Sequence, residues 1–340
     1  MGGRFVEKRI LHTAIWQSIL LLCICLALVA LNGKKHGKQH QVSVYAKSSL
    51  QDTIDSIVSN GPNYIKVKKA QKLIGNIYID TDVLRQKVKI EYETRMPFVF
   101  YGIEQQGGDI VKRSHISYVE SSGRYCAILD FVLAGVYEVK VCQDAQYIYL
   151  GFFKPSELYE KVVLIDPGHG GIDSGTLSVN PQYTEKEINL SLARKIERKL
   201  EQDKKIKVYL SREKDKYLSP EDRVKFIHAL NPDICISIHC NSAGNTEASG
   251  VEVLYSKKNQ DKGIRSKQLA KDCLKGILKE TKQVNRGVVK GDNIYILRKA
   301  EVPIALVEIG FLSNQEEFSY LINSDYQNKI ADGIIEAIRK

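Results

Sequence analysis

The hydrophobic and polar positions divide the chain into segments with different periods. Residues 10–31 carry no charged residue and end in a dense apolar block from Ile19 to Leu31. Between residues 50 and 155, short runs rich in Val, Ile, Tyr and Phe alternate with turn residues, a pattern typical of antiparallel strands. From Val162 onward, apolar strands alternate with amphipathic helices, which indicates an α/β layer fold.

These periods predict the domain organisation. We expect a cytoplasmic tip and membrane segment at 1–32, a stalk at 33–49, a small all-β domain at 50–155 and an α/β domain at 160–340, with a mixed sheet and helices on both faces. At 340 residues and 43% hydrophobic composition, the chain has enough apolar material for two such cores. A short helix is expected at 49–60.

The individual elements of the α/β part follow from the same pattern. Strands are predicted at 162–166, 207–211, 233–239, 250–256, 293–297 and 304–309. Helices are predicted at 185–201, 220–229, 264–280 and 326–339. The second helix has standard start signals, because Ser219 can cap it and Pro220 occupies its first position.

The apolar segment at the amino terminus predicts export of the remainder. It follows the basic residues Arg4, Lys8 and Arg9 and is long enough for the roughly 20 residues that span a bilayer. A cleaved export signal has the same layout, but the A-x-A cleavage pattern is missing, so we favour an uncleaved anchor. The protein is then anchored in the membrane with its bulk outside, or secreted to the cell wall if the segment is cleaved.

Charge and cysteine content narrow the partners. The net charge of +10 suits a polyanion, and export argues against nucleic acid as that partner; the alternative is that basic residues on solvated helix faces, such as Lys195 and Arg198, serve solubility. The seven cysteines match no Cys-based zinc module and no dense disulfide scaffold. Cys126 and Cys142 form the one pair worth testing for a disulfide, and the alternative is free buried thiols.

The first candidate for chemistry is the run D-P-G-H-G-G, in which an apolar strand ends at Asp166 and a Gly-rich turn presents His169. The second is T-E-K-E-I-N-L, a helix start in which Thr184 and Glu187 form a capping box and leave the carboxylate of Glu185 free. The third is the apolar strand that ends in His239. Because the carboxyl ends of the strands share one edge, two imidazoles and one carboxylate can converge as a catalytic zinc site.

The fourth candidate is Glu308, which interrupts the apolar strand I-A-L-V-E-I-G-F-L. A buried carboxylate has to be protonated, paired or bound to a metal. Burial raises its pKa toward the range in which it can exchange protons with water and with a leaving amine. The alternative is a buried ion pair with Arg298 or Arg212.

Taken together, D-P-G-H-G-G, T-E-K-E-I-N-L, S-I-H-C-N-S, N-R-G-V and V-E-I-G-F-L-S-N closely resemble the zinc-dependent N-acetylmuramoyl-L-alanine amidases of bacterial cell walls, of the amidase_3 type. The resemblance covers about residues 160–340. It implies Zn²⁺ on His169, Glu185 and His239, with Glu308 as the catalytic carboxylate. Asn241 either orients substrate or serves the turn.

The resemblance implies hydrolysis of the amide between N-acetylmuramic acid and L-alanine in peptidoglycan, which is the expected partner. We expect a monomer, with no nucleic acid bound. The residues alone leave open another zinc amidohydrolase of the wall or a catalytically silent wall-binding scaffold. The β-rich domain loosely resembles wall-targeting modules, and a simple spacer is the alternative.

Overall fold

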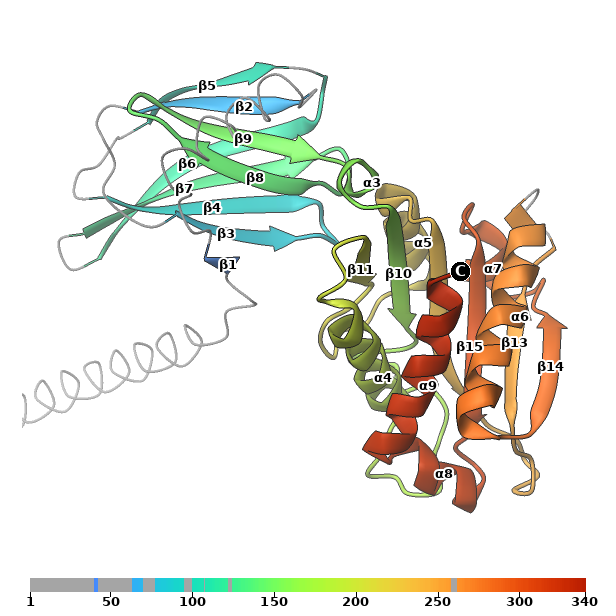
Figure 1. Cartoon of the computed structure of the whole chain (residues 1–340). Helices are drawn as coiled ribbons and strands as arrows, with labels where there is room; N and C mark the ends of the chain where they lie inside the picture. The colour runs from blue at the N-terminus through green and yellow to red at the C-terminus, as the bar shows by residue number, and fades with distance from the viewer. Residues whose placement is uncertain are drawn as a thin grey trace, which may run out of the picture.

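The computed structural model describes residues 40–41, 63–69, 77–94, 100–106, 108–121, 124–257 and 262–340. The predicted membrane segment, almost all of the stalk and the short helix expected at 49–60 lie outside these residues. Among the helices of the described part, none is both long enough and apolar enough to cross a bilayer. A β-rich part and an α/β part, which lie at opposite ends of the molecule, make up the described chain (Figure 1).

The α/β part is built on one mixed sheet with the strand order β11-β10-β12-β15-β13-β14. Its neighbours pair in parallel except β13 and β15, which are antiparallel. The strands are β10 (Lys161–Pro167), β11 (Ile206–Leu210), β12 (Ile234–Asn241), β13 (Val251–Tyr255), β14 (Asn285–Lys290) and β15 (Ile304–Phe311). The carboxyl ends of β10, β12 and β15 therefore lie along one edge of the sheet.

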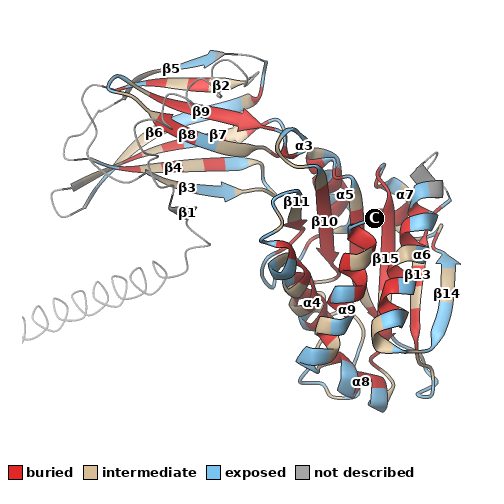
Figure 2. Ribbon diagram, viewed as in Figure 1, coloured by how far each residue is buried: buried red, intermediate tan, exposed pale blue. Residues whose placement is uncertain are grey.

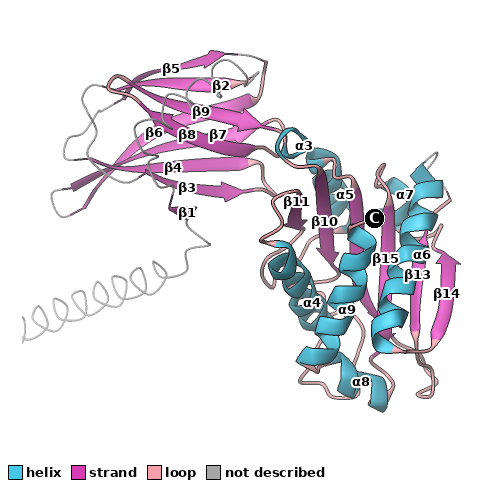
Figure 3. Cartoon of the chain, in the orientation of Figure 1, coloured by secondary structure: helices cyan, strands magenta, loops and turns pink. Residues whose placement is uncertain are grey.

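Helices cover both faces of this sheet, as the sequence predicts (Figure 3). Alternate strand residues point to opposite sides, so that Val163 and Ile165 belong to one core and Val162 and Leu164 to the other. The first core is covered by α4 (Glu185–Leu200), α6 (Lys262–Thr281), α8 (Gln315–Leu321) and α9 (Ser324–Ile338). The second is covered by α5 (Pro220–Leu230) and α7 (Tyr295–Lys299).

Two antiparallel sheets form the β-rich part, with strand orders β1-β3-β4-β7-β6 and β5-β2-β9-β8. A shared apolar core joins them, and Phe131 of one sheet meets Phe152 of the other edge to face at 6.3 Å between ring centroids. Such a ring pair contributes about 0.5 to 1.5 kcal/mol beyond its buried area. The bounds are β1 (His40–Gln41), β2 (Tyr64–Lys69), β3 (Ile77–Asp82), β4 (Lys87–Thr94), β5 (Phe100–Gln106), β6 (Val111–Ser121), β7 (Arg124–Leu133), β8 (Glu138–Gln143) and β9 (Tyr147–Phe153).

A short helix, α3 (Pro155–Leu158), connects β9 to β10, and side chains pack across this junction. Val136 is buried in the same core as α5, and its backbone N–H donates to Ala229 O at 3.3 Å. Glu138 pairs with Lys207 of β11 at 3.1 Å. These contacts lie at the amino ends of the parallel strands, the edge opposite to the carboxyl ends. Figure 2 shows buried residues along β9 of the β-rich part and along β10 of the α/β sheet.

One predicted element is wrong, because residues 295–299 form helix α7 and the predicted strand at 293–297 does not exist. The edge strand of this region is β14, earlier in the chain. A short apolar run cannot by its period distinguish a strand from a buried helical turn. Here Ile296 and Leu297 are both buried against the α5 side of the sheet, which a helical turn allows. Helix α8, capped by Asn314, was not predicted.

Candidate metal centre

His169 lies just beyond the carboxyl end of β10, in a tight turn closed by paired backbone hydrogen bonds between Gly170 and Asp173. Its own φ is +61°, a left-handed conformation that costs a residue other than glycine about 1 to 3 kcal/mol. The Nδ1 atom of its ring contacts Asp173 Oδ2 at 2.8 Å. This contact fixes the ring orientation and leaves the Nε2 atom to face the centre of the site.

Glu185 begins helix α4 and is almost fully buried. The capping box predicted for this helix is present, since Glu187 accepts from the backbone N–H of Thr184 at 3.2 Å. Glu185 is therefore free of the cap. Its carboxylate instead accepts hydrogen bonds from the backbone N–H groups of Thr176 at 2.6 Å and Cys240 at 3.0 Å.

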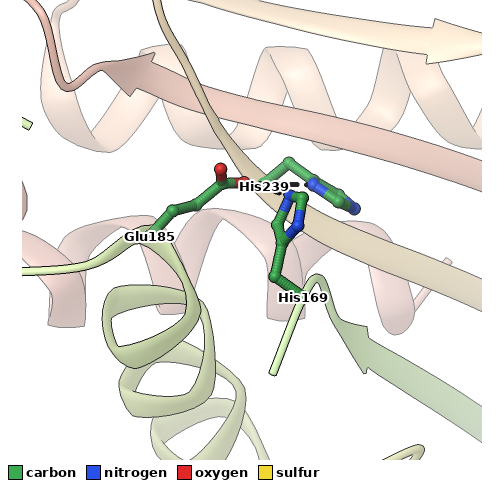
Figure 4. A group of neighbouring side chains, drawn as sticks. All are labelled: His169, Glu185 and His239. Carbon is green, nitrogen blue, oxygen red and sulfur yellow. Dashed lines mark hydrogen bonds and ion pairs between the residues drawn. The ribbon is translucent and has the colours of Figure 1, made fainter. Parts of the chain in front are cut away.

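His239 completes the group from strand β12, and Figure 4 shows its ring and that of His169 facing the Glu185 carboxylate. The Nδ1 atom of His239 lies 3.1 Å from Glu185 Oε1, and the Nε2 atom of His169 lies 3.2 Å from the same oxygen. The candidate ligand atoms of these residues all lie within 4.8 Å of one another. The sequence-predicted ligands thus converge on one point.

Glu185 and His169 stabilise each other's charged forms. Burial alone would raise the pKa of Glu185, but hydrogen bonds from His169 and His239 hold this pKa far below its usual range. Burial opposes a charge on His169, yet Glu185 and Asp173 together raise the pKa of its imidazole. The site thus holds a permanent carboxylate that attracts positive charge, whether a proton or a metal ion.

Glu308 stands on β15 directly beside His239 in the parallel ladder with β12. Its Oε2 atom is buried and has no hydrogen-bond partner. Burial raises the pKa of Glu308 to about 7, with Glu185 and Glu252 adding to the rise and His239 opposing it. A carboxyl group with such a pKa exchanges protons readily near neutral pH.

The ion pair considered for Glu308 is absent from the part of the chain that the structure describes. Arg212 donates instead to the backbone carbonyls of Pro167 and Gly168. Asn241 is held by neighbouring groups, since its Nδ2 donates to Glu252 at 2.6 Å and its Oδ1 accepts from Ser242 N at 2.8 Å. These contacts favour the turn role of Asn241.

Comparison with known proteins bears on the same residues. The model of the Amidase_3 family, described as N-acetylmuramoyl-L-alanine amidase, matches residues 163–340, which include the whole group above. The chain belongs to this amidase family. The match leaves out the β-rich part.

Individual relatives of the amidase agree with this match. YqiI, an uncharacterised protein of Bacillus subtilis (strain 168), is 35% identical over 178 residues, which cover 52% of this chain and 83% of the relative. The germination-specific N-acetylmuramoyl-L-alanine amidase of the same organism is 30% identical over 192 residues, covering 52% of this chain and 78% of the relative. A solved N-acetylmuramoyl-L-alanine amidase from Clostridium difficile 630 is 37% identical with a TM-score of 0.50, covering 53% of this chain and 95% of that chain.

Several residues that support the site in this amidase were not found from the sequence. Asn189 follows Glu185 by one helical turn and donates to its Oε1 at 3.3 Å. Helical spacing from Glu185 could have indicated it, because residues at i and i+4 share a face. Asp173, which contacts His169, sits in an irregular turn where no period operates.

Proposed function

We propose that the chain is a zinc-dependent N-acetylmuramoyl-L-alanine amidase that hydrolyses the amide between N-acetylmuramic acid and L-alanine in peptidoglycan. The observation that carries the proposal is the convergence of His169 Nε2 and His239 Nδ1 on one oxygen of buried Glu185, at 3.2 and 3.1 Å. Family membership supplies the reaction class, and the site supplies the residues.

Zinc is the metal that suits these residues. Two imidazoles and one carboxylate are a ligand set that catalytic zinc sites use, with a remaining position open to water or substrate. Zinc in such a site polarises a carbonyl and acidifies water. His169, Glu185 and His239 would hold it, and Asp173 would fix the orientation of the His169 ring.

Glu308 would act as the proton carrier of the reaction. Its unpartnered Oε2 can accept a proton from the attacking water and return it to the nitrogen of the leaving L-alanine. Its pKa of about 7 suits both steps, because the group then accepts and releases protons at similar pH.

The parts of the chain outside the α/β domain bear on where the protein is located and what it binds. We propose that residues 1–32 anchor the protein in the membrane with the amidase part outside, or direct its secretion to the wall if they are cleaved. The β-rich part would bind the wall or serve as a spacer. We propose a monomer with peptidoglycan as its partner and no nucleic acid.

The test is digestion of purified peptidoglycan by the full chain, with products identified by mass. We expect intact stem peptides with a free L-alanine amine, and we expect a chelator to abolish their release and added zinc to restore it. Glu308→Gln should bind zinc normally and lose at least about 100-fold in rate. Glu316→Gln, which changes an exposed carboxylate on α8, is the matched control and should keep full activity.

Other products would assign another reaction. Shortened stem peptides would indicate a peptidase, and deacetylated sugars would indicate a deacetylase. Zinc and wall binding without cleavage would indicate a silent scaffold, and full activity in Glu308→Gln would remove Glu308 from the mechanism.

A further inference from the structure

Two buried arginines donate hydrogen bonds to the backbone carbonyls of Pro167, Gly168 and His169. Arg212 donates from Nε to Pro167 O at 3.0 Å and from Nη2 to Gly168 O at 2.9 Å. Arg223 donates from Nη1 to Pro167 O at 3.0 Å and from Nη2 to His169 O at 2.8 Å. The exposed fractions of the two arginines are only 3% and 7%. The backbone that presents His169 is thus held from the inside of the protein.

The two arginines differ in what else they bind. Arg223 forms a buried ion pair with Asp166, which also accepts hydrogen bonds from Ser211 and Ser237. Arg212 has no carboxylate in hydrogen-bond contact among the described residues. Burial, together with the charge of Arg223, lowers the pKa of Arg212 to about 10. The guanidinium of Arg223 is therefore held in place by an ion pair as well as by carbonyls, whereas that of Arg212 is held by hydrogen bonds to carbonyls alone.

One of those carbonyls belongs to a different element. Nη2 of Arg212, which contacts Gly168 O, also donates to Lys186 O at 2.8 Å. Lys186 follows Glu185 in the first turn of α4, and Gly168 precedes His169. A single nitrogen of Arg212 therefore connects the backbones that carry two of the proposed zinc ligands.

His169 needs such support because of its backbone conformation. It is a non-glycine residue at a φ of +61°, and Gly170 after it has a φ of +137°. A left-handed histidine persists only where its surroundings hold it. The carbonyl contacts of the two arginines add to the Gly170–Asp173 hydrogen bonds that close this turn.

We propose that Arg212 is a positioning residue of the metal centre, which sets the distance between His169 and Glu185 before any metal binds, with Arg223 supporting the same turn. The planar guanidinium is essential to this role, because its donors have fixed directions that reach several carbonyls at once, whereas the single ammonium group of lysine cannot reproduce this fork. The inference rests on the proposed metal centre. It does not depend on the identity of the bond that is cleaved.

The test compares Arg212→Lys with Arg223→Lys in the full chain. Zinc affinity is measured by competition with a chelator, ligand geometry by the absorption spectrum of the cobalt-substituted protein, and stability by thermal unfolding of the metal-free protein. Arg198→Lys is the matched control, because Arg198 is an exposed arginine of α4 whose guanidinium donates, within the described part of the chain, to Arg194 O of its own helix alone. None of these readouts needs amidase activity, so a wrong assignment of the substrate would not be confused with a wrong assignment of Arg212.

We expect Arg212→Lys to have the larger effect on zinc affinity and Arg223→Lys to have the larger effect on the unfolding temperature. Arg212→Lys should lower zinc affinity 10- to 100-fold and change the cobalt spectrum, as loss of a supporting contact to metal ligands does. Arg223→Lys should lower the unfolding temperature more, because it disturbs the buried pair with Asp166, and should lower zinc affinity less. Arg198→Lys should match the wild type in all three measurements.

The proposal is overturned if zinc affinity and the cobalt spectrum of Arg212→Lys equal those of the wild type. It is also overturned if affinity losses merely follow the losses in unfolding temperature across both variants. Should Arg212→Lys fail to fold, Arg212→Gln replaces it, because its amide brings no charge into the buried site and its nitrogen still has two donors. The same loss of affinity and the same spectral change are then required.

Discussion

Glu252 lies directly opposite Glu308 in the antiparallel ladder between β13 and β15. Residues paired in this way stand on the same face of a sheet, with Cβ atoms about 4.5 to 5.5 Å apart. The Glu252 carboxylate adds its negative charge to the effect of burial on Glu308, whose pKa rises to about 7. The sheet pairing thus contributes to the proton affinity of the proposed catalytic carboxylate.

This raised pKa predicts how stability depends on pH. Glu308 binds its proton more tightly in the folded chain than in the unfolded chain, so its contribution is complete below pH 4.5 and is lost as the pH rises through about 7. A rise in pKa from 4.5 to about 7, at about 1.4 kcal/mol per pKa unit, corresponds to between about 3 and 4 kcal/mol. We expect the chelator-treated wild type to lose this amount relative to Glu308→Gln between pH 4 and pH 8, measured by urea unfolding. Parallel profiles for the two proteins would show that Glu308 has an ordinary pKa.

Gly168 predicts a steric test of the metal centre. A Cβ at this position would lie 2.2 Å from Cε1 of the His239 ring, and its backbone needs no left-handed conformation. We expect Gly168→Ala to displace that ring and lower zinc affinity at least about 10-fold. Gly244→Ala is the control, because a Cβ there has nothing within 4 Å. Equal zinc affinities in the two variants, measured by chelator competition, would contradict the assignment of His239 as a ligand.

The cysteines predict a labelling result. Cys126 and Cys142 are free in the structure, which decides against a disulfide between them. Burial, with a contribution from Asp144, raises the pKa of the Cys142 thiol to about 12. We expect Cys142 to react slowly with a thiol reagent at pH 8 in the native protein and rapidly in denaturant, without any reductant. Protection of Cys126 and Cys142 that persists in denaturant and disappears on reduction would instead indicate a disulfide.

The junction between the two parts of the chain predicts a coupled loss of stability. Val136 belongs to the β-rich part in sequence, yet it is 5% exposed and packs in the core beside Phe226 and Ile227 of α5. Val136→Ala should destabilise the α/β part by about 2 kcal/mol, because it leaves a cavity in that core. Val119→Ala, at an exposed position on β6, should have almost no effect. Denaturant unfolding, monitored by the release of zinc, would measure the stability of the α/β part directly. An unchanged midpoint in Val136→Ala would argue against a shared core.

The sequence predicted these residues because each has a recognisable place at the start, near the end or inside a regular element. Thr184 and Glu187 mark the start of α4, which assigns Glu185 to its first position. His239 and Glu308 end or interrupt apolar strands, where a polar residue is conspicuous. Family resemblance then selected these residues together.

Apart from Asn189, which helical spacing could have indicated, the supporting residues could not be predicted in this way. Arg212 contacts backbone carbonyls, and any residue can supply a carbonyl, so no partner residue appears in the sequence. Residues 293–297 were wrongly predicted as a strand because, in so short an apolar run, a strand and a helical turn differ only in what packs against the side chains. The register between Glu252 and Glu308 depends on the antiparallel insertion of β13, which periodicity does not specify.

The junction at Val136 and Glu138 also determines which side of the α/β sheet the β-rich part occupies. It joins the β-rich part to the amino edge of the α/β sheet, whereas His169, His239 and Glu308 lie toward the carboxyl edge. β10 alone has 7 residues and so spans about 23 Å between these edges. The β-rich part and the metal centre are therefore kept apart by at least the length of one strand, because they lie at opposite edges of the same sheet.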